Sequence, residues 1–210
     1  MDYTKLTSLE KDVLREVGNI GAGNAATSMS KLVNKKIEMK VPSVKVVTFD
    51  EMMDLIGGPD KTIVAMLFQI QGKIPGTVYF ILSIQDAESL IENITGASDF
   101  SLQDNIEDNE MGFSALQEIG NIVTGSYLSA LSDFTGLKMQ PSVPHLSIDM
   151  AGAVLTFGLI EISQLSDYAI IINTKISDEE YNGIHGQFFL IPELDSLPQL
   201  FKALGIDTDE

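Results

Sequence analysis

Two Glu-x-x-Asn pairs are the residues of this chain whose types and spacing could do chemistry. Glu16 and Asn19 form the first pair, and Glu118 and Asn121 form the second, 102 positions later. On a helix, residues three apart lie on one face, about one turn from each other. A carboxamide can donate and accept hydrogen bonds at once, so it can orient a water molecule. The spacing therefore predicts two polar sites, each holding a carboxylate beside a carboxamide.

The two pairs belong to an internal repeat. A shift of 102 positions places residues 16–20 (Glu-Val-Gly-Asn-Ile) on residues 118–122 (Glu-Ile-Gly-Asn-Ile). A lone Glu-x-x-Asn arises by chance about once in a few hundred positions at ordinary residue frequencies. Two copies in register, each with the same flanking pattern, favour a function for the Glu and the Asn. The flanking residues that the shift matches are Asp12 with Ser114 and Pro42 with Pro144.

Each copy is predicted to open with a long helix. Thr7 and Glu10 can form a capping box at the start of the first one. Asn34 and Gly136 occupy equivalent positions after the two helical patterns. Both residue types tolerate a positive φ, so the two helices are expected to end at the same place.

One stripe of each helix is predicted to be polar, and the stripe beside it apolar. In the first helix the polar stripe spans about 60° of arc, and its last residue, a glycine, leaves a spot where another protein surface could approach closely. Its members are Asp12, Glu16, Asn19 and Gly23, matched by Ser114, Glu118, Asn121 and Gly125 in the second helix. The apolar stripes are expected to face the core. They hold Leu6, Leu9, Val13, Val17 and Ile20 in the first copy, and Met111, Ala115, Ile119 and Ile122 in the second.

The remaining patterns predict an α+β (mixed α/β) fold with a largely antiparallel or mixed central sheet. Several predicted strands follow one another without a helix between them, which excludes an all-parallel sheet. Residues 62–70 are almost continuously apolar, as expected for a strand buried on both faces. We therefore expect a single pseudo-two-fold domain over residues 1–210, built of repeats 6–96 and 108–205 and joined by an acidic connector, 97–107. The other predicted strands are 37–41, 44–46 and 76–82 in the first copy and 138–143, 146–148, 168–173 and 187–191 in the second, with a short helix at 87–94.

Composition excludes several classes of protein. The net charge of −17 argues against nucleic acid and anionic membranes as partners. Cysteine is absent, and His145 and His185 lie far apart, so no metal site is predicted. No apolar run reaches the roughly 18 residues of a membrane span, and the first residues do not resemble a signal peptide, so a cytoplasmic location is expected. Residues 21–26 fit a loose Gly-x-Gly-x-x-Ala pattern, but they lie inside a helical periodicity, which argues against nucleotide binding.

The complete pattern Asp/Ser-x3-Glu-x2-Asn-x22-Pro resembles the signature of the CheC/CheX/FliY phosphatases of bacterial and archaeal chemotaxis. The resemblance covers essentially the whole chain, and the signature is complete in both copies. Members of the CheX branch are shorter, and those of the FliY branch carry an additional C-terminal switch domain. The chain therefore looks most like the CheC branch. The signature stands here as Asp12, Glu16, Asn19 and Pro42 and again as Ser114, Glu118, Asn121 and Pro144.

The resemblance implies a phosphatase that hydrolyses the aspartyl-phosphate of the chemotaxis response regulator CheY. Asn19 and Asn121 would each orient the attacking water, as a glutamine does in GTPases. Glu16 and Glu118 would pair with a lysine of the receiver domain. The chain would need no cofactor of its own, because Mg²⁺ is expected in the partner receiver.

The flanking residues are expected to have smaller roles. Pro42 and Pro144 would fix a turn between two strands, since proline locks φ and donates no hydrogen bond. Asp12 and Ser114 are expected at the rim of the sites, with little direct part in the chemistry.

The resemblance also implies a second partner, the receptor deamidase CheD. Its docking segment would be the stretch after the second proline, although the same apolar stretch could simply be core or a buried turn. The alternative function is a non-catalytic adaptor that binds phosphorylated CheY and CheD, and a structural part of the flagellar switch is a third possibility. The internal pseudo-dimer favours a monomer. The proposed docking residues are Asp149, Met150, Ala151, Gly152, Ala153, Val154 and Leu155.

Overall fold

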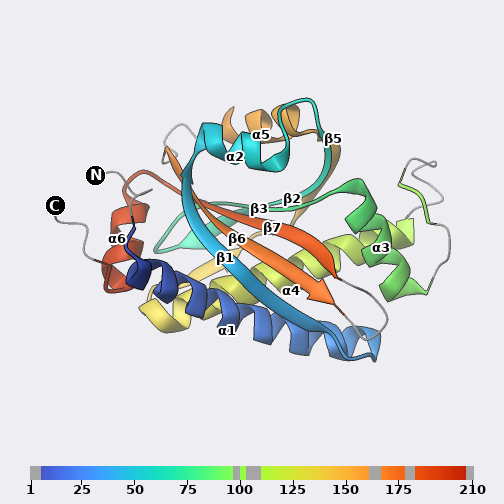
Figure 1. Ribbon diagram of the computed structural model, residues 1–210, viewed down its shortest axis with the longest axis horizontal. Helices are drawn as coiled ribbons and strands as arrows, with labels where there is room; N and C mark the ends of the chain where they lie inside the picture. Colours follow the sequence, from blue (N-terminus) through green and yellow to red (C-terminus); the bar gives the residue numbers. More distant parts are fainter. Residues whose placement is uncertain (1–5, 97–99, 103–109, 161–166, 178–182, 207–210) are drawn as a thin grey trace.

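The computed structural model describes residues 6–96, 100–102, 110–160, 167–177 and 183–206, apart from the side chains of residues 157–160. The order of helices and strands is the same in the two repeats, except that two short strands in the second repeat replace one long strand in the first (Figure 1). The helices are α1 (Ser8–Val33), α2 (Phe49–Ile56), α3 (Ile84–Thr95), α4 (Glu110–Thr135), α5 (Ala151–Ile160) and α6 (Ser196–Ala203). The strands are β1 (Glu38–Thr48), β2 (Thr62–Gly72), β3 (Gly76–Leu82), β4 (Met139–Pro141), β5 (His145–Met150), β6 (Tyr168–Ser177) and β7 (Ile184–Pro192).

The ends of the long helices α1 and α4 are where local chemistry predicts them. The Thr7 backbone N–H donates to Glu10 Oε2 at 2.6 Å, and the Glu10 N–H donates to Thr7 Oγ1 at 3.4 Å, so the capping box is confirmed. Asn34 (φ 52°) and Gly136 (φ 71°) both adopt the left-handed conformation immediately after their helices. Because the two helices end at equivalent residues, the Glu-x-x-Asn pairs have equivalent depths along them.

The seven strands form one sheet in which every pairing is antiparallel. The strand order is β1-β6-β7-β3-β2-β4, with β5 also paired to β2. The predicted α+β class, with a tandem duplication around a largely antiparallel sheet, is therefore confirmed.

The two repeats exchange their first strands. Strand β1 of the first repeat pairs with β6 of the second, bringing Val44 opposite Ile172. In return, β4 and β5 of the second repeat pair with β2 of the first, bringing Ser147 opposite Ala65. The central strands β3 and β7 then join the two halves at the pseudo-two-fold axis. Neither repeat holds a complete sheet without the other.

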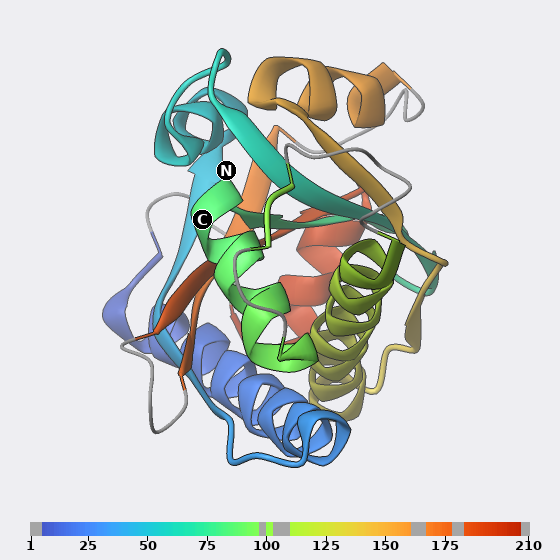
Figure 2. The ribbon, with the colours of Figure 1, turned by 90° about the vertical axis from the view of Figure 1, so that its right-hand side faces the viewer.

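Helices cover both faces of the sheet (Figures 1 and 2). Helices α1, α3, α4 and α6 lie on one side, while α2 and α5 lie together on the other. Strand β2 contributes to both cores: Met66 and Phe68 pack toward the four-helix side, and Ala65 and Leu67 toward α2 and α5. Burial on both faces explains the continuous apolar run in β2.

The sequence patterns do not predict helices α2 and α5. They begin 102 positions apart, at Phe49 and Ala151, so they are equivalent elements of the two repeats. Helix α2 has only eight residues, although a capping box between Thr48 and Glu51 defines its start. Helix α5 is apolar on nearly all sides and so lacks the 3.6-residue alternation of a surface helix.

Part of the predicted acidic connector packs against the protein. Leu102 is buried, and Phe100 packs against the main core. Their backbone N–H groups donate to Glu88 and Glu92 of α3, at 2.9 and 3.0 Å respectively. These three residues, 100–102, are therefore attached to α3, and the other residues of the connector lie outside the described part of the chain.

Tyr127 of α4 joins the long helices to the sheet. Its ring lies against Gly21 of α1 and meets the Phe188 ring at a centroid separation of 4.8 Å. Its hydroxyl shares a hydrogen bond of 2.7 Å with Thr174 Oγ1 on β6. One buried side chain thus connects both repeats through α1, α4 and two strands.

Tyr127 predicts a loss of stability at alkaline pH. Burial raises the pKa of Tyr127 to about 12, against a smaller lowering by the hydrogen bond with Thr174. The folded protein therefore holds this proton more tightly than the unfolded chain, in which tyrosine titrates near pH 10. The resulting stabilisation is complete below about pH 10 and is lost as the pH rises toward about 12. Urea unfolding should show a steeper alkaline decline in the wild type than in Tyr127→Phe, and equal slopes in both would contradict the prediction.

Candidate functional site

The four motif residues stand exposed on the long helices. Glu16 and Asn19 are exposed on α1, and Glu118 and Asn121 are exposed on α4. Each pair is positioned by buried residues of the same helix: Val17 and Gly18 in the first copy, Ile119 and Gly120 in the second. A helix fixed by its buried side therefore presents each carboxylate and carboxamide to solvent, as predicted.

The two sites point away from each other. Helices α1 and α4 run side by side in opposite directions (Figures 1 and 2), and Gly21 meets Tyr127 where they touch. Glu16 lies about 140° around α1 from Gly21, and Glu118 lies about 180° around α4 from Tyr127. The helix–helix contact therefore separates two outward-facing polar stripes.

In the first copy, a bulge in strand β1 holds Asn19. The Val41 backbone N–H donates to Asn19 Oδ1 at 3.3 Å. Val41 lies where the pairing of β1 with β6 shifts, between Lys40 and Ser43, so its N–H is turned out of the ladder. Pro42 sits in this bulge and has no N–H of its own to place. The expectation that Pro42 fixes a turn between two strands is therefore wrong, because β1 continues through it.

The second copy has a break where the first has a bulge. Pro144 is buried and lies between β4 and β5, in agreement with the prediction of a turn between strands. The adjacent Val143 is 87% exposed, and Ser142 ties this segment to β2 by two hydrogen bonds with Gln69. Within the described residues, the Asn121 carboxamide makes no counterpart of the Asn19–Val41 bond. The two sites thus lie on equivalent helices but differ in the strand beside the helix.

The flanking polar residues also differ between the copies. Asp12 forms an ion pair of 2.8 Å with Arg15 on the same helix, where both side chains are more than half exposed. Its counterpart, Ser114, is exposed and carries no charge. Neither Glu16 nor Glu118 takes part in an ion pair among the described residues. Their carboxylates are therefore available to a cation brought by a partner.

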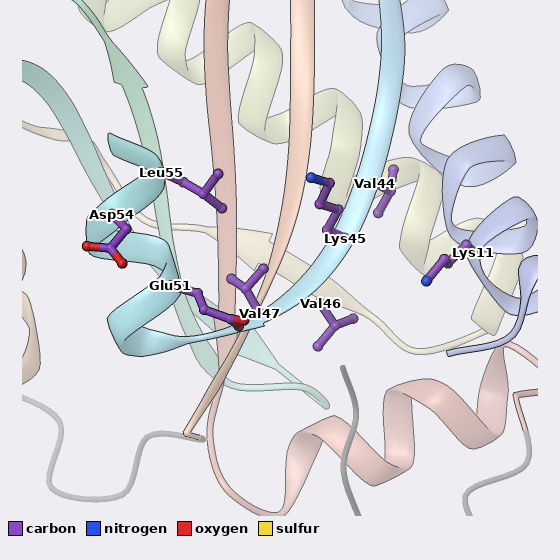
Figure 3. Close-up of a pocket in the computed structure, with 8 residues that line it drawn as sticks. All are labelled: Lys11, Val44, Lys45, Val46, Val47, Glu51, Asp54 and Leu55. Atoms are coloured by element: carbon purple, nitrogen blue, oxygen red, sulfur yellow. The ribbon is translucent and has the colours of Figure 1, made fainter. Parts of the chain in front are cut away.

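None of four pockets in the described part of the chain is lined by a motif Glu or Asn. One of about 610 Å³ lies between β1 and α2 (Figure 3) and mixes Lys11 and Lys45 with Glu51 and Asp54. The motif residues instead stand on exposed helix surface. Such an arrangement cannot enclose a small substrate, and it suits a reacting group held in the concave site of another protein.

Three residues expected in the core are exposed. Leu9, Ile20 and Met111 are 75%, 44% and 72% exposed, whereas Leu6, Val17 and Ile119 of the same predicted stripes are buried. Leu9 and Met111 each precede their motif Glu by seven residues, which is only about 20° short of two full turns. Helical periodicity therefore places them on the exposed face of Glu16 and Glu118 and not on the core face.

The CheC-like family model matches residues 9–46 and 111–148, which are the two copies of the motif helix and the strand segment after it. The CheY-P phosphatase CheC of Bacillus subtilis is 44% identical over 197 residues, covering 93% of this chain and 94% of that protein. The chain belongs to the CheC-like family.

Other similar proteins are more distant. The flagellar motor switch phosphatase FliY of Bacillus subtilis is 27% identical, and the match covers 68% of the CheC-like chain and 36% of FliY. Among solved structures, Thermotoga maritima FliY has a TM-score of 0.72 at 19% identity, covering 96% of this chain and 98% of that one. The FliM middle domain of Helicobacter pylori has a TM-score of 0.63 at 14% identity, covering 94% and 99%. At these identities the two structures establish a shared fold.

The predicted docking segment of the CheC-like chain is divided between core and surface. Ala151, Val154 and Leu155 are buried in the core beneath α2 and α5, as the simpler interpretation expected. Asp149, Met150 and Ala153 are exposed, and Gly152 is half-buried. A cleft of about 300 Å³ between β5 and α5 is lined by Ala65, Leu67, His145, Ser147, Asp149, Ala153 and Val154.

Two absences concern the described ranges of the CheC-like chain. Across the described ranges, no group of three or more His, Cys, Asp or Glu side chains is placed to hold a metal ion. No helix in the same ranges is long and apolar enough to cross a membrane.

Proposed function

We propose that this chain is a phosphatase that hydrolyses the aspartyl-phosphate of the phosphorylated chemotaxis response regulator CheY. The observation that carries the proposal is the pair of exposed Glu-x-x-Asn sites on the outward sides of α1 and α4. Membership of the CheC-like family supports it, as do the names of the Bacillus subtilis relatives, a CheY-P phosphatase and a flagellar motor switch phosphatase. We place the chain, like its substrate protein, in the cytoplasm, and we expect it to act as a monomer.

The reaction needs little covalent help from the enzyme. A water oxygen attacks the phosphorus in line, the bond from phosphorus to the aspartyl oxygen breaks, and the products are the free carboxylate and inorganic phosphate. Asn19 or Asn121 would orient this water. Asn19 keeps its amide N–H groups and a second lone pair on Oδ1 after accepting from Val41. Each carboxamide can therefore still both donate a hydrogen bond to the water and accept one from it.

The two glutamates would align the complex. Glu16 and Glu118 are exposed and would each pair with a lysine of the receiver domain. Mg²⁺ bound by the receiver would neutralise the phosphoryl oxygens, so we expect this chain to contribute no metal ligand. Both partners then supply parts of one active centre, which forms only in the complex.

A receiver-dephosphorylation assay tests the proposed function. The protein is added in catalytic amount to CheY that has been phosphorylated in the presence of Mg²⁺, and the remaining phosphate is followed over time. Faster loss of phosphate, with many turnovers per protein, is the expected result. A stoichiometric complex that protects the phosphate or leaves its decay unchanged would support the alternative function, a non-catalytic adaptor.

We further propose that the exposed part of segment 149–155 binds the receptor deamidase CheD. It lies beside the cleft between β5 and α5, which has an apolar floor formed by Ala65, Leu67 and Val154 and a rim that carries Asp149. Ala153→Arg should lower the affinity for CheD by about tenfold or more, because a long charged side chain would stand in the contact. Calorimetric titration with purified CheD would measure this loss.

Matched controls separate docking from folding. Ala153→Ser changes the same exposed position with little added volume and should bind CheD normally. Neither variant should change the basal rate of receiver dephosphorylation, since Ala153 lies on α5, across the sheet from α1 and α4 (Figure 1). Unchanged affinity of Ala153→Arg would contradict this docking surface.

A further inference from the structure

We propose that the receiver docks along a strip of each long helix that extends beyond the Glu-x-x-Asn pair at both ends. Each strip begins with an apolar anchor two turns before the Glu and ends with a glycine one turn after the Asn. The inference rests on the proposed function for the identity of the partner. The first docking strip is Leu9, Asp12, Glu16, Asn19 and Gly23, and the second is Met111, Ser114, Glu118, Asn121 and Gly125.

The apolar anchors are the first observation. Leu9 is 75% exposed and Met111 is 72% exposed. A single exposed apolar side chain is ordinary in a soluble protein. These two, however, are equivalent in the repeat and lie on the same face as the exposed Glu that follows seven residues later. The internal packing of neither helix uses them, so they are free to contact a partner that covers the Glu.

The glycines are the second and independent observation. A Cβ built on Gly23 or Gly125 would meet no atom within 4 Å apart from those of its chain neighbours and of its own helix backbone. The other glycines in the middle of these helices, Gly18, Gly21 and Gly120, would each place a Cβ against a neighbouring side chain. Glycine inside a helix is about 1 kcal/mol less favourable than alanine. The fold thus gains nothing from Gly23 and Gly125, and both lie one turn beyond the motif Asn.

Together the two observations define the shape of the partner's surface. From anchor to glycine each strip spans fifteen residues, and the fourteen steps between its ends cover about 21 Å along the helix. At the glycine end the partner can approach the helix backbone directly, and at the other end it must offer apolar area. Between them it must bring a cation to Glu16 or Glu118. A receiver domain with its phosphorylated aspartate and a lysine at the centre of the contact fits this order, one receiver for each strip.

Leu32 and Phe134 provide a matched control on the same two helices. They are 49% and 51% exposed, and they are also equivalent in the repeat. Each lies sixteen residues after its motif Glu, about 160° around the helix. Like the anchors, they are exposed apolar side chains, but they lie on the opposite side of the helix. A receiver that contacts only the docking strips would therefore not contact them.

The test measures binding and turnover on the same proteins. The binding probe is CheY loaded with Mg²⁺ and beryllofluoride, a stable mimic of the aspartyl-phosphate. Leu9→Ala/Met111→Ala should raise Kd and KM by about tenfold with little change in kcat. Leu32→Ala/Phe134→Ala should bind like the wild type. Gly23→Ala/Gly125→Ala should weaken binding by about fivefold while raising the thermal midpoint, because each alanine favours the helix and crowds the partner.

The outcomes separate the docking strips from the proposed chemistry. If the anchor variant binds no more weakly than the Leu32/Phe134 control, the strips are wrong, even where the wild type is an active phosphatase. If the wild type binds the loaded receiver without hydrolysing phosphate, the phosphatase proposal fails and the Kd values of the variants still decide the strips. A wild type that neither binds nor hydrolyses contradicts both. If the glycine variant has a higher thermal midpoint but binds as tightly as the wild type, the receiver does not approach the helix closely at Gly23 and Gly125.

Discussion

Replacing both Asn19 and Asn121 by alanine should remove the effect of the protein on receiver phosphate, lowering the catalysed rate by about 100-fold or more. The carboxamide is the group we expect to hold water in line with phosphorus, and loss of one such positioned hydrogen-bonding group costs enzymes factors of this size. Each single variant should keep the activity of the other site, because the two sites face opposite ways. Phosphate loss from CheY, followed at saturating receiver, is the measurement.

The fold should survive this change. Asn19 makes one described hydrogen bond, from the Val41 N–H, and Asn121 is exposed on its helix. The matched control is Asn24→Ala/Ser126→Ala, which alters the equivalent residues next to the strip glycines and off the docking strips. It should leave the rate unchanged. A folded Asn19→Ala/Asn121→Ala protein that works at the wild-type rate would exclude this mechanism.

Gly21→Ala should destabilise the protein by about 1–3 kcal/mol, although alanine is the better helix former. The added Cβ would overlap the Tyr127 ring and come within 3.0 Å of the Tyr127 Cα. A ring can turn aside, but a backbone atom at that distance requires α1 and α4 to move apart. Since Tyr127 also bonds to Thr174, a shift of α4 would disturb the contact with the sheet. Denaturant unfolding measures the change in the free energy of unfolding.

Gly23→Ala is the control, two residues along the same helix. Apart from its chain neighbours and its own helix backbone, no atom lies within 4 Å of the Cβ that this substitution adds, so only the gain in helix propensity remains. We therefore expect opposite signs: a lower free energy of unfolding for Gly21→Ala and a higher one for Gly23→Ala. Equal effects of the two substitutions would show that the contact with Tyr127 does not limit the approach of the helices.

Much of this protein follows from local patterns in its sequence. Thr7 with Glu10 and the pair Asn34 and Gly136 define helix ends because capping and left-handed backbone depend on a few neighbouring residues. The 102-residue repeat and the exposure of both Glu-x-x-Asn pairs follow from a shift and a helical period that can be counted. The apolar run in β2 predicts a strand buried on both faces, and the fold class follows from successive strands with no helix between them.

The tertiary structure decided what local patterns do not encode. The exchange of β1 and β4–β5 between the repeats joins residues such as Val44 and Ile172, and pairing across such a distance leaves no periodic signal in the chain. Where the core ends on α1 depended on which neighbours the helix met, because an apolar stripe is wider than the contact it makes: Val17 is buried, whereas Ile20 of the same stripe is 44% exposed. Pro42 lies in a bulge and not in a turn because β6 pairs with β1 on both sides of it. The same bulge directs the Val41 N–H toward Asn19.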